Sequence, residues 1–237
     1  MGVKMIFKRS YVLENAKKKK HSFASVFFKT IFALVIIVFL ADVLFNLFFY
    51  QIKVEGASMQ PTYNADLSLS EDASASIYKD NVVVKKFWSY QPGDIVIISV
   101  NNKEIIKRVI AVEFQTLTLK KHQADNFEYY HFYLDDKEID ESYLGQNFTA
   151  MNNLYFENFC HVQGVEKSGV GVNQQAQLVL KENELFALGD NRGNSEDAID
   201  YRKPYSNSQV IGVVAFSYKY NQTLLQALWQ KFLGIFV

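Results

Sequence analysis

Two residues of this chain have side chains that could together cut a peptide bond, a serine and a lysine. Ser58 lies in the stretch VEGASMQPTY, residues 54–63, a few positions after a long apolar run. A serine hydroxyl becomes a nucleophile only when a nearby base takes its proton. The fold must therefore bring a base to Ser58.

The four histidines are weak candidates for that base. His122, His131 and His161 lie in stretches that resemble ordinary strands or loops, and His21 belongs to a basic N-terminal stretch. A Ser-His-Asp triad would need one of them. This alternative is disfavoured but stays open at the level of the sequence.

Lysine can serve as the base when its site keeps it neutral. Free lysine titrates near 10.4, and burial among apolar groups lowers its pKa. If EIIKRVIA, residues 104–111, forms a strand, Ile105, Lys107 and Val109 share one face. Lys107 then has the most apolar setting of the lysines outside the apolar run. The alternative is a lysine that extends from a sheet edge into water, and the strand pattern alone favours this alternative.

The apolar run predicts a helix that crosses a membrane. Residues 31–50 read IFALVIIVFLADVLFNLFFY, and only Asp42 and Asn46 interrupt them. About 20 apolar residues are enough to span the hydrocarbon core. A buried core helix and a cleavable signal peptide are the alternatives. The run is longer than the apolar region of a signal peptide and no convincing small-x-small site follows, so we expect an uncleaved anchor.

The charge of the chain is divided unevenly, although its formal net charge is zero. Residues 1–21 contain seven basic residues and one acid, whereas the remainder contains 18 basic and 24 acidic residues. By the positive-inside rule, the basic tail stays in the cytoplasm and the part after residue 50 lies outside. An acidic body does not suit nucleic acid, so we expect the lipid bilayer as a partner and no nucleic acid.

Short runs rich in Val, Ile and Thr predict strands after the apolar run. Turn residues separate them, for example Pro92-Gly93-Asp94 and Lys181-Glu182-Asn183. The predicted fold is mostly β, built from antiparallel sheets, with one N-terminal transmembrane helix. The runs are KDNVVVKKF, GDIVIISV, KEIIKRVIAV, QTLTLKK, FEYYHFYLDDKEID, QAQLVLKENELFALGD and QVIGVVAFSY.

Four stretches, in chain order, resemble the sequence boxes of the type I signal peptidase family in its Gram-positive-like form. They are SMQPT at 58–62, GDIVI at 93–97, KRVIA at 107–111 and GDNRGNSED at 189–197. The resemblance extends from about residue 54 to 218 and implies sheets of the signal-peptidase type. The implied organisation is a basic cytoplasmic tail at 1–30, a membrane anchor at 31–50, a catalytic β core at 51–113 and 180–220, a β cap at 114–179 and an apolar C-terminal tail at 221–237. We expect this tail, which is too short to span a bilayer, to pack on the body; the alternative is that it lies along the membrane surface.

The resemblance implies a membrane-bound protease that removes signal peptides from exported preproteins with a Ser-Lys dyad. Ser58 would be the nucleophile and Lys107 the base. Gly56 would lie at the oxyanion hole, and Ser195 would orient the lysine. The residues implied in substrate binding are Met59, Asp94 and Ile95.

The family resemblance also implies the substrates and partners. Substrates would carry small residues at the first and third positions before the cut. No cofactor and no metal are expected, and the secretion translocon is a further partner to consider.

The chain departs from the family pattern after the last box. Ala198-Ile199 stands where Ser-Arg is usual, which leaves Arg202, Arg192 or no residue as the partner of Asp197. This departure motivates an alternative function, a non-catalytic accessory or chaperone for a dedicated exported substrate such as a surface-fibre subunit. The presence of both Ser58 and Lys107 favours the enzyme. A soluble repressor-like protein that cleaves itself is disfavoured by the anchor.

Overall fold

The computed structural model describes residues 3–65, 79–124, 127–144 and 152–234. It divides the chain into two units, Met1–Phe48 and Phe49–Val237. The polar loop EDASAS at 71–76, which the family pattern marks as an insertion, lies outside the described residues.

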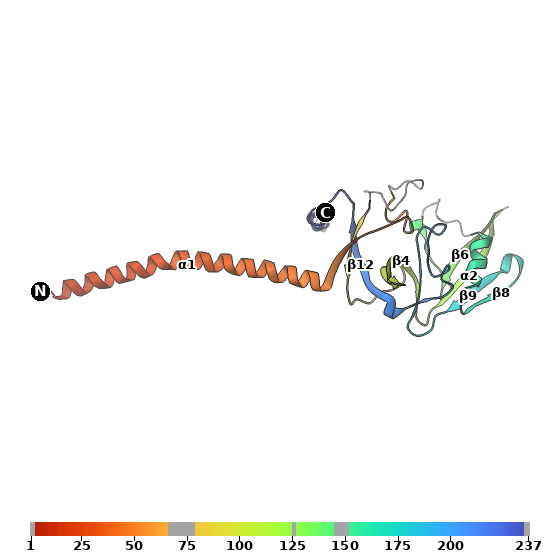
Figure 1. Cartoon of the computed structure of the whole chain (residues 1–237), viewed down its shortest axis with the longest axis horizontal. Coiled ribbons are helices and arrows are strands. Elements are labelled where there is room, and N and C mark those ends of the chain that lie inside the picture. Colours follow the sequence, from red (N-terminus) through yellow and green to blue (C-terminus); the bar gives the residue numbers. More distant parts are fainter. Residues whose placement is uncertain (1–2, 66–78, 125–126, 145–151, 235–237) are drawn as a thin grey trace. The chain divides into compact units, whose positions relative to one another are not determined.

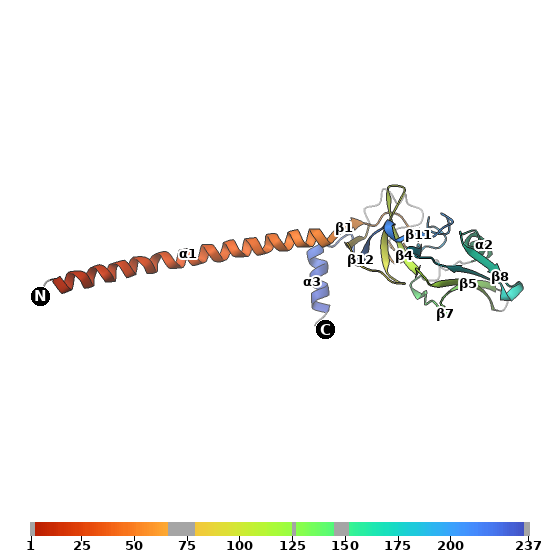
Figure 2. The same ribbon diagram turned by 90° about the horizontal axis from the view of Figure 1, so that it is seen from below.

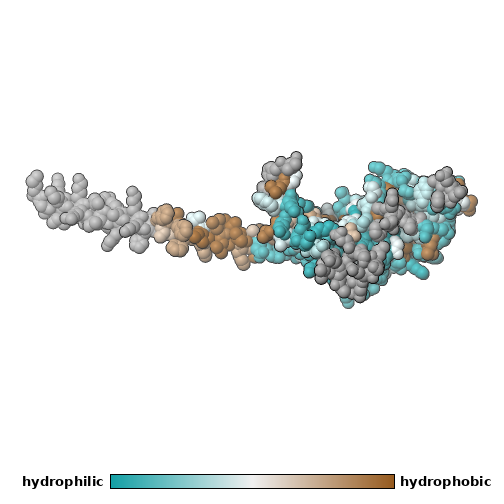
Figure 3. Space-filling model, turned by 90° about the horizontal axis from the view of Figure 1, so that it is seen from above, coloured by the Kyte–Doolittle hydropathy of each residue, from teal (hydrophilic) through white to brown (hydrophobic). Residues whose placement is uncertain are grey.

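The first unit is a single helix, α1, Val3–Phe48. Its segment Phe23–Phe48 is long and apolar enough to cross a membrane, and none of it is buried within the protein. Figure 3 shows apolar residues, in brown, along this segment. A helix is therefore present where the sequence predicts the membrane anchor, although it ends at Phe48, because Phe49 and Tyr50 belong to the first strand.

The second unit contains a seven-stranded antiparallel sheet (Figure 1). Its outer strand β1 pairs with β2, so that Phe49 lies opposite Lys85. Near its middle, β3 and β4 form a hairpin in which Val96 lies opposite Lys107. In sheet order the strands are β1 (Phe49–Lys53), β2 (Asn81–Lys85), β12 (Val210–Tyr218), β3 (Ile95–Val100), β4 (Lys103–Val112), β10 (Glu184–Leu188) and β11 (Tyr205–Ser206).

A second antiparallel sheet of five strands follows directly on β4, and Figure 2 shows it from below. The helix α2 (Asn153–Cys160) lies against β6, β8 and β9. In sheet order the strands are β7 (Lys137–Glu138), β6 (Phe127–Leu134), β5 (Thr116–Ala124), β9 (Gln175–Val179) and β8 (Val165–Ser168). The prediction of a mostly antiparallel β fold is confirmed.

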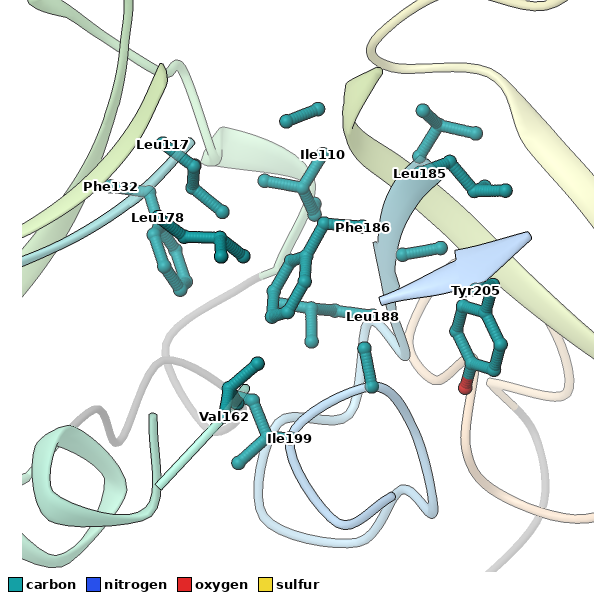
Figure 4. Packing of buried hydrophobic residues seen from close by; sticks show 14 of the residues in the cluster. Ile110, Leu117, Phe132, Val162, Leu178, Leu185, Phe186, Leu188, Ile199 and Tyr205 are labelled. Carbon is teal, nitrogen blue, oxygen red and sulfur yellow. The ribbon is translucent and has the colours of Figure 1, made fainter. Parts of the chain in front are cut away.

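One hydrophobic core joins the two sheets. Leu117, Phe132 and Leu178 of the five-stranded sheet belong to the same buried cluster as Ile110 and Phe186 of the seven-stranded sheet (Figure 4). Alternation along β5 and β6 sends these apolar side chains to one face. A smaller cluster underlies the serine loop; it consists of Val54, Met59, Tyr63, Val82, Val84, Ile97 and Ile106.

The last helix, α3 (Leu224–Gly234), forms within the apolar C-terminal tail. Its Ala227 is 6 % exposed, and its Lys231 amine lies 4.7 Å from the centre of the Phe216 ring of β12. Its large apolar side chains Leu225, Leu228, Trp229 and Leu233 are exposed.

Candidate active site

Ser58 lies in the loop that follows β1. The loop after β10 holds it from the other side, because the backbone N–H of Asn191 donates to the Ser58 carbonyl at 3.0 Å. The Asn191 side chain also donates to the Ala57 carbonyl at 3.2 Å. The backbone on both sides of the serine is therefore fixed by one asparagine from a distant part of the chain.

The N-terminal half of the serine loop is held by Asn64 and Asp80. The Asn64 side-chain amide donates to the carbonyls of Val54 and Gly56, both at 2.9 Å. Asn64 and Asp80 also bind each other through two backbone-to-side-chain hydrogen bonds of 2.9 and 2.8 Å. Gly56 has a φ of +77°, in the left-handed region that glycine adopts without a steric penalty.

Lys107 projects from β4 into the interior and is only 3 % exposed. Val109 belongs to the larger core cluster and Ile105 packs against it, whereas Ile106 belongs to the smaller cluster. This agrees with the predicted apolar face, and the alternative of a lysine extending into water is wrong. Burial lowers the pKa of Lys107 below its ordinary value. Its Nζ lies 3.2 Å from the Ser58 Oγ, within hydrogen-bonding distance.

Asp197 is the charged residue that most strongly opposes this lowering of the Lys107 pKa. It is 4 % exposed and accepts hydrogen bonds from the backbone N–H groups of Gly189, at 3.0 Å, and Ile199, at 3.2 Å. Burial raises the pKa of the Asp197 carboxyl group. Arg192 forms a 2.6 Å ion pair with Glu141 instead. Backbone groups thus bind Asp197 where the family pattern has an arginine.

Ser195 lies beside these groups. Its Oγ is buried and forms no hydrogen bond of standard geometry within the described part of the chain, although it is close enough to lower the pKa of Asp197. A Cβ added at Gly189 would overlap this Oγ, so the serine packs directly on the glycine. The Ser195 hydroxyl therefore keeps the capacity to accept hydrogen bonds beside Asp197.

Arg108, the neighbour of Lys107 on β4, connects the loops around the site. Its Nε and Nη2 bind the two carboxylate oxygens of Asp190 at 2.8 and 2.6 Å. Thr62 of the serine loop donates to the same carboxylate at 2.5 Å, and Arg108 also donates to the Gly93 carbonyl at 2.9 Å. Arg108 was not among the site residues predicted from the sequence. Its position on β4 next to Lys107, on the opposite face of the strand, was the only sequence feature that could have indicated it.

A cleft of about 290 Å³ opens beside Ser58 and Lys107. It lies between the end of β1 and the first half of β4. Its lining residues are Ile52, Lys53, Val54, Glu55, Ser58, Ile97, Glu104, Ile105, Ile106 and Lys107.

The residues expected to bind substrate lie elsewhere than in this lining. Met59 is 1 % exposed and belongs to the smaller core cluster, against which Ile95 also packs. The Asp94 carboxylate accepts the Gln91 N–H at 3.0 Å inside the turn before β3. The structure therefore brings Ser58, Lys107 and Ser195 into one region, with Gly56 in the serine loop. Met59, Asp94 and Ile95 do not line the cleft.

Neither a metal centre nor a histidine base is found at this site. Among the described residues, no group of three or more His, Cys, Asp or Glu side chains could hold a metal ion. His122 and His131 lie on the five-stranded sheet, where His122 Nε2 is 3.2 Å from the Tyr133 hydroxyl and His131 Nδ1 is 3.1 Å from Glu138. The base nearest to the serine is a lysine.

Comparison with known proteins identifies the family. Residues 27–219 match the family model described as signal peptidase, peptidase S26. The chain belongs to the S26 signal peptidase family. This span contains both members of the Ser58–Lys107 pair and continues into α1.

Curated relatives cover most of the chain. It is 27% identical over 192 residues to signal peptidase I S of Bacillus subtilis strain 168, covering 80% of this chain and 88% of that protein. It is 24% identical over 202 residues to signal peptidase I of Bacillus amyloliquefaciens, covering 85% and 92%. A crystal structure of a signal peptidase I from Enterococcus faecalis V583 matches with 20% identity and a TM-score of 0.35, over 53% of this chain and 97% of that one. The family assignment rests on the sequence match.

Proposed function

We propose that this protein is a membrane-anchored serine endopeptidase that removes signal peptides from exported preproteins with a Ser58–Lys107 dyad. The observation that carries the proposal is the 3.2 Å separation of the Lys107 Nζ from the Ser58 Oγ, with the amine buried. A serine needs a base at this distance, and a lysine can be that base only when it is neutral. The lowered pKa of Lys107 favours the neutral form.

The reaction takes place in two halves. Neutral Lys107 accepts the proton of Ser58 as Oγ attacks the carbonyl carbon of the scissile bond. The tetrahedral intermediate then collapses, Lys107 returns the proton to the leaving amine, and an ester to Ser58 remains. A water molecule, deprotonated by Lys107, hydrolyses this ester and releases the signal peptide.

The developing oxyanion needs hydrogen-bond donors, and the Ser58 backbone N–H is the proposed one. Loss of one such donor commonly lowers the rate about 10²–10³-fold. Gly56 shapes the loop next to it, and the Asn64 hydrogen bonds to the flanking carbonyls keep this loop rigid. Ser195, whose hydroxyl has spare capacity, would orient the Lys107 amine.

The cleft supports an extended substrate lying between β1 and β4. Successive side chains of an extended segment point to opposite sides, so the first and third residues before the cut face the same wall. The small volume of the cleft and its branched aliphatic lining favour small residues at these positions. Backbone pairing would supply affinity, and the small pockets would supply selectivity.

The anchor explains how the enzyme meets its substrates. With the basic tail in the cytoplasm, the β body lies outside the membrane, where signal peptides of exported proteins emerge. The bilayer and exported preproteins are the proposed partners, with the secretion translocon as a further one.

The test uses the full chain in proteoliposomes with a preprotein that carries an Ala-x-Ala site. Ser58→Ala and Lys107→Ala should each lower the cleavage rate by at least about 10³-fold. The matched controls are Ser168→Ala and Lys103→Ala, because both residues are exposed and Lys103 shares β4 with Lys107. Cleavage by Ser58→Ala at the rate of the unaltered protein would rule out the dyad. A protein that cleaves nothing, yet is required for export of one substrate, would favour the accessory function.

A further inference from the structure

Strand β6 has an open edge on the side of β7. β7 pairs with β6 only at Tyr133 and Leu134, and the Ile139 N–H binds the Phe132 carbonyl at 3.0 Å. The pairing of β6 with β5 on the other side is continuous, so alternate residues of β6 point their backbone groups toward β7. Phe132 is one of these residues, and Tyr130 is the next. The Tyr130 N–H and C=O therefore face the open edge, where no described strand binds them.

A hydrogen bond of the neighbouring strand supports this orientation. Lys121 lies opposite Tyr130 on β5, and its N–H binds the Gln174 carbonyl at 3.0 Å. Gln174 directly precedes β9, which lies on the far side of β5 from β6. Opposed residues in antiparallel strands either bind each other or both point away, so the backbone groups of Tyr130 point away from β5. An edge of this kind can receive an extended peptide as an additional strand.

A pocket of about 490 Å³ lies along this open edge. Its lining includes residues 129–131 of β6 and continues through the segment that follows β7. Three acids belong to the lining, Glu138, Asp140 and Glu141, and no lysine or arginine does. We call this the acidic pocket. A peptide strand laid on the edge of β6 would place its side chains against these carboxylates.

Glu141 gives the acidic pocket an unused hydrogen-bond acceptor. Its side chain is only 8 % exposed, and both Arg192, at 2.6 Å, and the Tyr143 hydroxyl, at 3.3 Å, donate to Oε1. Oε2 is buried and has no hydrogen-bond partner within the described part of the chain. A buried carboxylate oxygen without a donor is unfavourable. An ammonium or guanidinium group in the pocket would compensate for it, so the pocket suits a cationic ligand.

Two contacts connect the acidic pocket to the active site. Its Glu141 binds Arg192, the residue after the asparagine whose N–H holds the Ser58 carbonyl. Tyr143, in the same segment, has its ring centre 4.0 Å from the guanidinium carbon of Arg108, the residue after the catalytic lysine on β4. The cleft uses the first half of β4, whereas the five-stranded sheet follows the end of β4. A preprotein bound in the cleft would therefore continue past the serine toward the acidic pocket.

We propose that the open edge of β6 and the acidic pocket bind an extended basic segment of a polypeptide, which adds to the sheet as a strand. That segment is the part of the preprotein that follows the cut, so the inference rests on the proposed function. Backbone pairing at Tyr130 would supply affinity, and lysine or arginine side chains at alternate positions would enter the pocket. The enzyme would then select substrates on both sides of the cut.

The first experiment measures binding without cleavage, with the full-length Ser58→Ala chain in non-ionic detergent. The probes are dye-labelled peptides of alternating threonine and lysine, or of alternating threonine and glutamate, each about ten residues and about 33 Å long. The diamine cadaverine serves as a free cation. Fluorescence anisotropy gives the Kd, and amide hydrogen exchange reports the protection of the Tyr130 N–H. The internal control is β8, the other edge strand of the same sheet.

We expect the lysine peptide to bind, and the Tyr130 N–H to exchange about tenfold more slowly in the complex while the amides of β8 stay unchanged. Glu138→Gln with Asp140→Asn removes two charges but keeps an acceptor oxygen on both side chains, and it should weaken binding about fivefold. The matched control is Glu166→Gln, which removes an exposed acid of β8. Equal binding of the glutamate peptide, unchanged exchange at Tyr130, or binding of cadaverine without the peptide would overturn the proposal.

The second experiment tests whether the preprotein supplies the segment. The unaltered chain cleaves two preproteins with the same Ala-x-Ala site and either lysine or glutamate at alternate positions, about four to twelve residues after it. We expect a KM about fivefold lower for the lysine preprotein, and Glu138→Gln with Asp140→Asn should remove this difference. Equal KM values in an enzyme that cleaves both would overturn the inference and leave the dyad standing. A chain that cleaves neither would remove the proposed function and, with it, the preprotein as the ligand.

Discussion

Gly189 provides the sharpest test of how the site is built. A Cβ at this position would lie 2.5 Å from the Ser58 carbonyl oxygen and 2.5 Å from the Ser195 Cβ, and it would overlap the Ser195 Oγ. Ordinary contact begins near 3.4 Å, so Gly189→Ala must displace Ser58, Ser195 or both by about 0.9 Å. Both neighbours are backbone or stem atoms, which cannot swing aside as the end of a flexible side chain can.

A displacement of this size has two measurable effects. Misplacing reacting groups by about 1 Å can lower the rate about 10²-fold, so we expect kcat/KM for preprotein cleavage to fall by about that factor. Overpacking of a tight interior costs about 1–3 kcal/mol, so the free energy of unfolding, followed by circular dichroism in detergent, should fall in this range.

The matched control is Gly193→Ala in the same loop. A Cβ at Gly193 meets no atom within 4 Å. We therefore expect this variant to keep its activity and to change stability by no more than about 0.5 kcal/mol. If Gly189→Ala cleaves as fast as Gly193→Ala, the close packing of this loop on Ser58 does not position the nucleophile, and the reasoning fails.

The remaining predictions concern buried charges. In the proposed mechanism neutral Lys107 is the active form, so kcat/KM should rise with pH through the folded pKa of Lys107, which burial holds below 10.5. Asp197→Asn removes the charge that most opposes this lowering, so the rise should move to lower pH; a rise that moves to higher pH would contradict the assignment. Arg192→Met removes the ion-pair partner of Glu141, whose side chain is only 8 % exposed. This variant should lower the free energy of unfolding by about 3–5 kcal/mol in denaturant titrations. The double variant Arg192→Met with Glu141→Met should recover most of that loss. A double variant no more stable than Arg192→Met would show that the unpaired Glu141 carboxylate does not cause the destabilisation.

Local sequence patterns predict the strands well because each run is rich in Val, Ile or Thr and is bounded by turn residues. The run GDIVIISV becomes β3 and KEIIKRVIAV becomes β4. The apolar run near the N-terminus predicts a helix but not its end. Phe49 and Tyr50 are as apolar as the helix before them, and only pairing with Lys85 and Val84 of β2 makes them a strand.

Long-range contacts set the limits of sequence reasoning at the site. Alternation along β4 predicts the apolar setting of Lys107, but its partner Ser58 is 49 residues away and only the family resemblance connects them. The pairing of Arg108 with Asp190 spans 82 residues and follows from no local pattern. The cleft lining is likewise unpredictable from the boxes, since strand twist and loop packing decide which side chains of β1 and β4 face it.

The helix α2 was not predicted from the sequence, for a different reason. It lies in a stretch rich in Asn and Gly with little periodicity, and it has only eight residues. Its N-cap, Asn152, accepts the N–H of Tyr155, and Phe156 and Phe159 are fully buried. A helix this short is marginal by itself, so tertiary packing of these two rings stabilises it.

Four acidic residues raise the pKa of Lys107. The structure weakens the electrostatic effect of each of them on the lysine in a different way. Asp190 is bound by the Arg108 guanidinium in a two-point ion pair, which compensates its charge locally. Glu196 and Asp200 are exposed, so water and salt screen them. The fourth, Asp197, is the only one of these that is buried without an ion pair to a described arginine or lysine.

Burial therefore acts on both members of the remaining pair. It lowers the pKa of Lys107 and raises that of Asp197, so that each shift favours the neutral form. An arginine beside Asp197 would stabilise the ionised carboxylate. Ala198 and Ile199, both less than 6 % exposed, occupy this place in the chain and supply no positive charge. The departure from the family pattern thus leaves the acid that most opposes the lowered pKa of Lys107 without the positive charge of an arginine at that place.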